Sequence, residues 1–180
     1  LDFNIIGETQ DDAIGEAFDK VARVVNLPYP GGVAIDREAK KGKTVYHLPT
    51  PHAEGEFNYS FSGLKTAVIN LVTKERNNNR EVKVEDLACS FQTHAINYLL
   101  DHALPAVDKY QVKQVVLAGG VSANSYLREQ IKLRLKDKDV EVVIPPIWCT
   151  TDNAAMIAKV GSYLYQEGVF ADLSLSADPS

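Results

Sequence analysis

A strand–helix–strand unit in the C-terminal half constrains the fold of this chain more than any other feature. The apolar run QVVLAGGV at 114–121 ends at paired glycines, and a second apolar run, VEVVIPP, follows at 140–146. Between them, Leu127, Ile131 and Leu135 recur at helical spacing. Two strands joined by one helix in about 33 residues form a parallel crossover unit. We therefore predict a mixed α/β fold with a largely buried sheet.

The same periodicity predicts further elements on the N-terminal side of this unit and one after it. The predicted strands cover 3–6, 44–48 and 57–61, and a type II turn is predicted at Pro30–Gly31. The predicted helices are one capped by Thr9 and ending near Asn26, one over 64–72, a longer one from Glu85 in which Pro105 marks a kink or an end, and one from Thr151 or Asp152 to about Gln166.

Composition excludes several classes of protein. With 180 residues, 45% hydrophobic and 24% charged, the chain is not disordered, collagen-like or a coiled coil, and it is long enough to need no disulfide or metal for its core. A net charge of −5 argues against wholesale coating of nucleic acid, although it leaves room for a local basic patch.

The sequence also bears on location. No apolar run approaches the roughly 20 residues that span a bilayer, and no basic-then-apolar leader opens the chain. Cys89 and Cys149 lack the paired spacing of a zinc site or a disulfide framework. We expect a cytoplasmic protein without a membrane partner.

Three carboxylates, Asp12, Glu16 and Asp19, fall on one stripe of the first predicted helix. One interpretation is a solvated face, with Asp19 paired to Arg23 one turn on. The other is an acidic wall that faces the hydroxyls of a ligand or a metal. The pattern by itself favours the solvated face.

The glycine pair Gly119–Gly120 lies where a strand ends and a helix begins, which lets a backbone approach a nucleotide at the helix N-terminus. A tight turn explains the pair equally well, since the pattern is not GxGxxG. Asn124 would then contact a ribose or base, or cap the helix. Asp152 would stabilise a helix start, or lie at the ligand edge of the sheet. The turn at 60–66 could hold a phosphate, but it lacks the P-loop spacing.

Four blocks of sequence together resemble one family. They are GETQDDAIGEAFDKVARVVNLPYPGG at 7–32, YSFSGLKTAV at 59–68, LAGGVSANSYLRE at 117–129 and CTTDNAAMIAKVG at 149–161. In this order they resemble the signature blocks of the TsaD family, the tRNA threonylcarbamoyladenosine transferases once labelled O-sialoglycoprotein endopeptidases. The resemblance covers nearly the whole chain.

The resemblance implies one lobe of the fold shared by actin, Hsp70 and sugar kinases (ASKHA), in which two lobes enclose a nucleotide. It implies transfer of a threonylcarbamoyl group from threonylcarbamoyl-AMP to an adenosine next to the tRNA anticodon, together with partner proteins of a modification complex. By the matching motifs, Asp19, Gly32, Asp36 and Asn124 would contact the acyl-adenylate, and Asp152 would be a ligand of iron or zinc. The resemblance assigns no catalytic residue in this chain.

The chain also departs from the family. CTTDN has one residue more than the usual CTDN, and the upstream glycine-rich turn, HxxxH metal-ligand pair and phosphate loop are absent. We therefore expect a C-terminal lobe over 1–150, with a final helix and tail over 151–180 that pack on a missing N-terminal lobe. Because one carboxylate cannot hold a transition metal, we expect the chain alone to bind metal weakly and to have no transferase activity.

Two alternatives stay open, a phosphotransferase related to sugar or acetate kinases and a non-catalytic scaffold lobe of the modification complex. A protease is excluded, since the sequence offers neither an activated nucleophile nor HExxH. If the final helix lacks its partner lobe, an Ala/Ile/Leu/Tyr surface between 154 and 165 should be exposed and should favour self-association.

Overall fold

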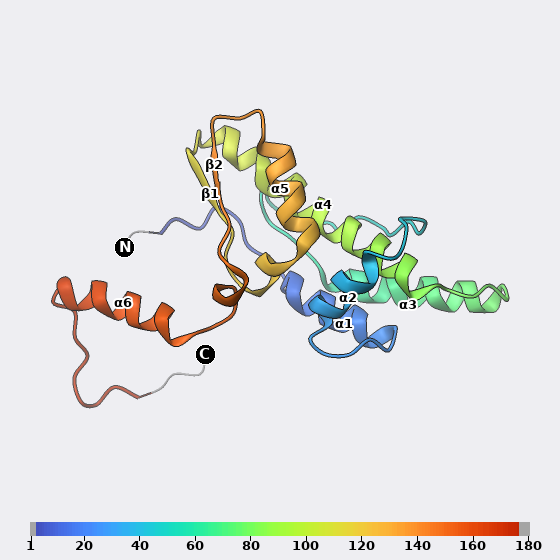
Figure 1. The fold of residues 1–180 in the computed structure, drawn as a ribbon, viewed down its shortest axis with the longest axis horizontal. Coiled ribbons are helices and arrows are strands. Elements are labelled where there is room, and N and C mark those ends of the chain that lie inside the picture. Colours follow the sequence, from blue (N-terminus) through green and yellow to red (C-terminus); the bar gives the residue numbers. More distant parts are fainter. Residues whose placement is uncertain (1–2, 177–180) are drawn as a thin grey trace.

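The computed structural model describes residues 3–176, so the ends of the two predicted segments, 1–150 and 151–180, lie outside the described residues. Helices dominate the described part, and the strands form one small sheet (Figure 1). In chain order the elements are α1 (Ile14–Val24), α2 (Gly31–Ala39), α3 (Ser62–Asn77), α4 (Val84–Lys109), β1 (Gln114–Val116), the 3-10 turn η1 (Gly120–Ala123), α5 (Ser125–Leu135), β2 (Glu141–Val143), the 3-10 turn η2 (Ile147–Cys149) and α6 (Ala154–Gln166).

Helix α4 is the centre of the core. Its 26 residues include Leu87, Phe91 and Ile96, none of which is exposed to solvent. Helix α2 packs on α4, and α1 packs on both α2 and α3. Phe18 of α1 meets Phe91 edge to face, with ring centroids 4.9 Å apart, which is a favoured aromatic geometry. The helix continues past Pro105 to Lys109, so of the two predicted alternatives, a kink or an end, the proline does not end the helix.

The crossover unit is confirmed. Strands β1 and β2 pair in parallel, with Val115 opposite Val142, and α5 connects them. Leu127, Ile131 and Leu135 of α5 are buried, as their spacing predicts. The sheet has only these two strands in the described chain, and Val116 is 58% exposed. The prediction of a largely buried sheet is therefore wrong for this chain.

The predicted strands at 3–6, 44–48 and 57–61 do not form. Tyr59 makes only an isolated parallel bridge with Thr9. The backbone N–H groups of Val45 and Tyr46 donate to Ser90 Oγ, at 3.1 and 3.0 Å, so a side chain of α4 takes the place of a neighbouring strand. The alternation in these segments reflects packing of loops on helices.

One helix start and one turn also differ from prediction. The Thr9 hydroxyl donates to the carbonyl of Asp12 at 2.8 Å, and α1 begins five residues after Thr9, at Ile14. Gly31 opens α2 instead of lying in the middle of a type II turn. The first helix therefore begins later than predicted, and the second begins where a turn was predicted.

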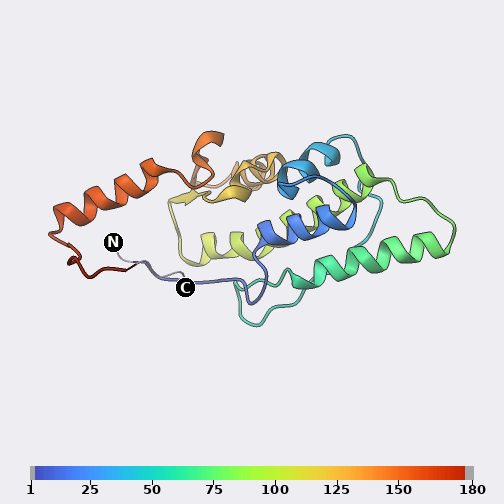
Figure 2. The same ribbon diagram turned by 90° about the horizontal axis from the view of Figure 1, so that it is seen from below.

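Helix α6 stands apart from the rest of the molecule. Both views show it projecting from the helical body, at the end toward which the N-terminal segment also runs (Figures 1 and 2). No residue of α6 is buried, and the predicted exposed apolar surface is confirmed, with Ile157 at 75% and Tyr165 at 70%. None of the helices in residues 3–176 has the length and apolar character needed to cross a bilayer.

Candidate ligand site at the ends of α1, α2 and α5

Asp19 joins α1 to the start of α2. Its half-buried carboxylate accepts a hydrogen bond from the N–H of Gly31 at 2.7 Å. That N–H has no partner within its own helix, and a carboxylate at a helix N-terminus is favoured by the helix dipole. Asp19 is thus neither part of a purely solvated stripe nor paired with Arg23.

The two glycines that open α2 have different roles. A Cβ on Gly31 would lie 2.6 Å from Asp19 Cα and 2.7 Å from Ala22 Cβ, so a side chain there would force α1 and α2 apart. A Cβ on Gly32 would meet no atom within 4 Å. Packing within this chain therefore requires glycine at Gly31, whereas the backbone at Gly32 is open.

Asp36 lies one turn beyond Gly32 and ties α2 to α5. Its Oδ1 accepts from the Ser125 hydroxyl at 2.7 Å and from the Ser125 N–H at 3.2 Å. Its Oδ2 accepts from Lys40 Nζ at 2.9 Å. The carboxylate thus accepts hydrogen bonds from the first residue of α5, which is 89 residues away in the sequence.

Asn124 caps α5, and its side chain is held in place by Gln92 of α4. Its Oδ1 accepts from the N–H of Leu127 at 3.0 Å, while Nδ2 donates to Gln92 Oε1 at 2.8 Å. Both side chains are buried. One amide hydrogen and one lone pair of Asn124 remain beyond these two bonds. Gln92 has no signal in the sequence, because its partner is 32 residues away.

The glycine turn lies beside these residues. Gly119 has φ of +79°, and added Cβ atoms at Gly119 and Gly120 would meet nothing within 4 Å. Arg128 donates to the carbonyls of Ser122 at 2.6 Å and Pro145 at 2.8 Å, which joins the loops that follow the two strands. The Ser122 hydroxyl is buried without a hydrogen-bond partner among the described residues.

Contacts therefore connect four of the five predicted site residues, from Asp19 through the start of α2 and Asp36 to Ser125 and Asn124. Two hollows of about 350 and 450 Å³ lie elsewhere, the first lined by residues of 45–47 and 70–75 and the second by residues of 107–113 and 138–140. The arrangement is an open surface of glycine backbone flanked by carboxylates and an amide.

Asp152 is not part of this arrangement. It is exposed in the link between η2 and α6, and it has no hydrogen bond or ion pair to residues 3–176. Asn153 caps α6 instead, accepting from the N–H of Met156 at 3.1 Å, so the predicted helix start is shifted. The described residues hold no cluster of three or more His, Cys, Asp or Glu side chains suited to a metal. A lone carboxylate does not fit a transition-metal site.

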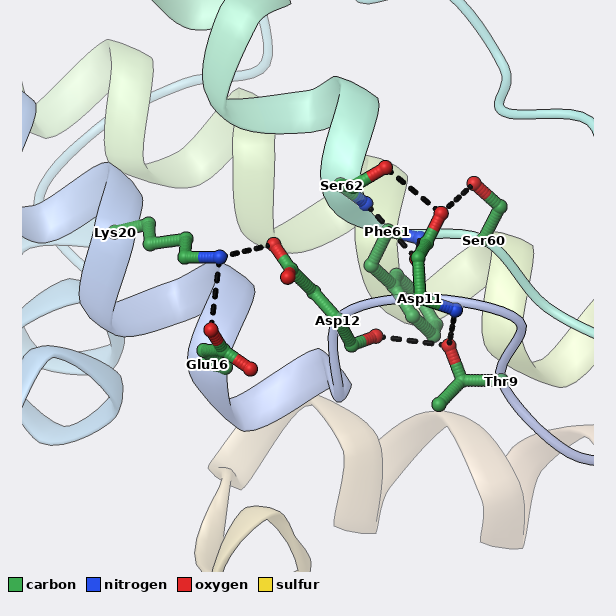
Figure 3. Close-up of polar contacts among 8 residues, drawn as sticks. All are labelled: Thr9, Asp11, Asp12, Glu16, Lys20, Ser60, Phe61 and Ser62. Carbon is green, nitrogen blue, oxygen red and sulfur yellow. Dashed lines mark hydrogen bonds and ion pairs between the residues drawn. The ribbon is translucent and has the colours of Figure 1, made fainter.

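The start of α3 is occupied by a carboxylate that sequence reasoning missed. Asp11 accepts from the hydroxyls of Ser60 and Ser62, at 2.5 and 2.7 Å, and from the N–H groups of Phe61 and Ser62, at 2.7 and 3.1 Å (Figure 3). Burial raises the pKa of Asp11, but these hydrogen bonds outweigh it and lower the pKa to about 2. The turn at 60–66, which the sequence suggests as a phosphate site, therefore binds the carboxylate of Asp11 instead.

The other two carboxylates of the acidic stripe share one lysine. Lys20 Nζ lies 2.6 Å from Asp12 and 2.8 Å from Glu16, so one ammonium bridges both carboxylates (Figure 3). These two side chains therefore form a surface ion-pair cluster, as the solvated interpretation predicts. Only Asp19, the last of the three, points toward α2, where it accepts from the N–H of Gly31.

The geometry defines an α/β protein in which glycine turns and helix starts leave stretches of backbone open. Comparison with known proteins gives the family. The family described as tRNA N6-adenosine threonylcarbamoyltransferase (TsaD) matches residues 1–159. Proteins named tRNA N6-adenosine threonylcarbamoyltransferase are 49% identical in Anoxybacillus flavithermus, 50% in Bacillus thuringiensis and 45% in Dictyoglomus turgidum.

These alignments cover 99%, 98% and 98% of the chain, and 53%, 52% and 53% of the respective relatives. The chain belongs to the tRNA N6-adenosine threonylcarbamoyltransferase family. It spans about half the length of the curated relatives that it matches.

Proposed function

We propose that this chain supplies about half of an enzyme that transfers a threonylcarbamoyl group from threonylcarbamoyl-AMP to the exocyclic amine of an adenosine in tRNA. Family membership over residues 1–159 supports this proposal. The observation that carries it is the series of contacts that links Asp19, the glycines of α2, Asp36 and Asn124 on one open surface.

In this proposal the open backbone at Gly32 admits the nucleoside part of the acyl-adenylate. Asp19 and Asp36 orient the site through bonds to helix starts, and their remaining lone pairs accept ribose hydroxyls. Asn124 offers its remaining N–H to the ligand, with its orientation fixed by Gln92 and Leu127. These groups bind and orient the substrate, which brings the acyl carbon within reach of the adenosine amine.

The chain alone is proposed to be inactive. A divalent iron or zinc ion would supply Lewis-acid polarisation in the longer protein, but the residues described here do not form a site for it. We propose that 1–150 is a C-terminal lobe of the ASKHA type and that 151–180 pack on an N-terminal lobe that supplies the remaining ligands. Partner proteins, tRNA and a cytoplasmic location belong to the same proposal.

Titration calorimetry tests the binding surface. A nonhydrolysable analogue of threonylcarbamoyl-AMP should bind the chain, and Gly32→Leu should abolish the heat because it fills the open backbone. Gly63→Leu is the matched control, since Gly63 also occupies the second position of a helix and also faces open space. Equal loss in both variants, or no heat from the unmodified chain, would contradict the proposal and favour a scaffold lobe.

A further inference from the structure

Positive charge is concentrated in two segments of this acidic chain. Residues 37–47 form the end of α2 and the loop after it, and residues 70–83 form the end of α3 and the loop to α4. Together they contain eight Lys and Arg but three Asp and Glu, a net charge of +5. The rest of the chain has 11 basic and 21 acidic residues, a net charge of −10. We call the two segments the basic surface.

The two segments lie side by side. A hollow of about 350 Å³ is lined by residues of 45–47 from one and of 70–75 from the other. Burial raises the pKa of Tyr46 above its usual value of 10, against the opposing effects of the Lys83 backbone and the Arg80 charge, so this phenol borders the second segment. Both views show the end of α3 and the loop to α4 at the opposite end of the molecule from α6 (Figures 1 and 2).

Half of the basic side chains of this surface have no carboxylate partner. Within the surface or next to it, the ion pairs are Arg37 and Lys41 with Glu38, Lys40 with Asp36, and Arg80 with Glu75. The other four basic side chains are exposed and form no ion pair with residues 3–176: Lys43, Lys74, Arg76 and Lys83. An external anion can therefore contact these four cations without breaking an ion pair of the chain.

Two carboxylates border the basic surface at the start of α4. Asp86 accepts from the backbone N–H of Lys43 at 2.8 Å, which fixes the first segment against this helix, and Glu85 is its neighbour. Both are half-buried, whereas the four unpaired cations are exposed. These carboxylates reduce the positive charge of the region but do not cancel it.

The composition of the surface favours nucleic acid over protein as the partner. The centre of a protein interface is apolar and aromatic and is depleted in lysine. Within 37–47 and 70–83, Val45 is the one large apolar side chain that is strongly exposed, at 52%. Lys, Arg and Asn side chains are typical contacts of phosphate and sugar, and the loop adds three exposed asparagines at 77–79 to the cations.

We propose that the basic surface binds the phosphate backbone of tRNA and holds the RNA beside the candidate ligand site. This inference rests on the proposed function, which makes tRNA the substrate. The surface begins directly after Asp36, and Gly32 lies at the other end of α2. A nine-residue helix is about 14 Å long, which is short compared with a tRNA, so one RNA molecule reaches both. The negative charge of the remaining surface repels phosphates and so favours one orientation of the RNA.

Fluorescence anisotropy with a labelled, unmodified tRNA transcript tests the contact. The measurement is made between about 50 and 200 mM salt on the unmodified chain and on a triple variant, Lys43→Gln, Lys74→Gln and Lys83→Gln. The variant should bind about tenfold more weakly or worse. Its slope of log affinity against log salt should be smaller by about 2–3, since each lost phosphate contact removes about 0.7–0.9. The three side chains are exposed and unpaired, so thermal melts should show an unchanged fold.

A second triple variant is the matched control. Lys65→Gln, Lys132→Gln and Lys159→Gln remove the same charge from exposed side chains outside the basic surface that form no ion pair with residues 3–176. Affinity and salt slope should stay close to those of the unmodified chain. Equal losses in both variants, an unchanged slope in the first, or no RNA binding by the unmodified chain would overturn the inference. So would displacement of the tRNA by polyglutamate at equal charge, which would favour an acidic protein as the partner.

Calorimetry with the acyl-adenylate analogue separates this inference from the proposed function. The heat should be the same for the first triple variant and the unmodified chain, because the three lysines lie outside the candidate ligand site. Analogue binding together with RNA binding that ignores the basic surface would refute the RNA contact alone. RNA binding that depends on the basic surface, without heat from the analogue, would support the RNA contact and refute the ligand site.

Discussion

Helices α4 and α6 are both rich in apolar residues, yet one lies at the centre of the core and the other contacts almost nothing. Helix α4 buries Leu87, Phe91 and Ile96 completely because α2, α5 and Phe18 of α1 pack against it. Helix α6 exposes Ile157 and Tyr165 because no element of residues 3–176 covers them. The difference shows that apolar periodicity marks a face that requires burial, whereas the rest of the fold determines whether a partner is present.

The largest expected effect comes from truncating one aromatic residue in each helix. Phe91→Ala should lower the free energy of unfolding by about 3–5 kcal/mol, because it leaves a cavity and removes the contact with Phe18. Tyr165→Ala in α6 should change it by less than about 0.5 kcal/mol in dilute samples. Urea denaturation followed by fluorescence measures both. Comparable losses would mean that α6 packs on the body.

A glycine pair sharpens the comparison. Gly31→Ala should destabilise the body by about 1–3 kcal/mol, because its Cβ would lie within 2.7 Å of both Asp19 and Ala22. Gly161→Ala should instead increase the helicity of α6, since alanine is favoured over glycine by about 1 kcal/mol in a helix interior. Circular dichroism with thermal melts separates the two effects. A stable Gly31→Ala variant would show that α1 and α2 are less closely packed.

Helix caps provide a third contrast. Asp11→Ala should cost about 1 kcal/mol, because it leaves the first N–H groups of α3 without their acceptor. Asn153→Ala removes the cap of α6 but should leave the unfolding of the body unchanged. Chemical denaturation of both variants beside the wild type gives the difference. An Asp11→Ala variant as stable as the wild type would refute the capping role.

The smallest expected effect is the pH dependence that Asp11 adds. Its pKa of about 2 is below the usual 3.8, so its stabilisation is complete above about pH 5 and disappears as the pH falls toward 2. Because Asp11 is exposed, screening reduces the contribution to about 1 kcal/mol. Denaturation between pH 2 and 5 should show wild type and Asp11→Asn converging at the acid end. A constant difference across this range would contradict the assignment.

The parts of the fold that follow local periodicity were predictable. The stripes of α3, α4 and α5 and the parallel crossover match the sequence because each depends on residues a few positions apart. The failed strands depend on distant partners. The backbone N–H groups of Val45 and Tyr46 donate to Ser90, which is more than 40 residues away, and no local sequence pattern predicts such a contact.

The residues of the candidate site also fall into two groups, those that sequence motifs suggest and those that only the folded structure shows. Asp19, Asp36 and Asn124 are candidates from motif resemblance, and hydrogen bonds at the starts of α2 and α5 link them in the structure, but their role in ligand binding stays a prediction. Gln92 and Ser125, which hold two of them, became visible only once the chain was folded. Asp152 is exposed and has no hydrogen bond or ion pair to residues 3–176, and its role as a metal ligand stays a prediction.

Arg128 gives the glycine turn one further property. Its guanidinium donates to the backbone carbonyls of Ser122 and Pro145. A backbone carbonyl does not titrate, unlike a carboxylate acceptor. The link between the loops that follow β1 and β2 therefore does not depend on the ionisation state of an acidic side chain.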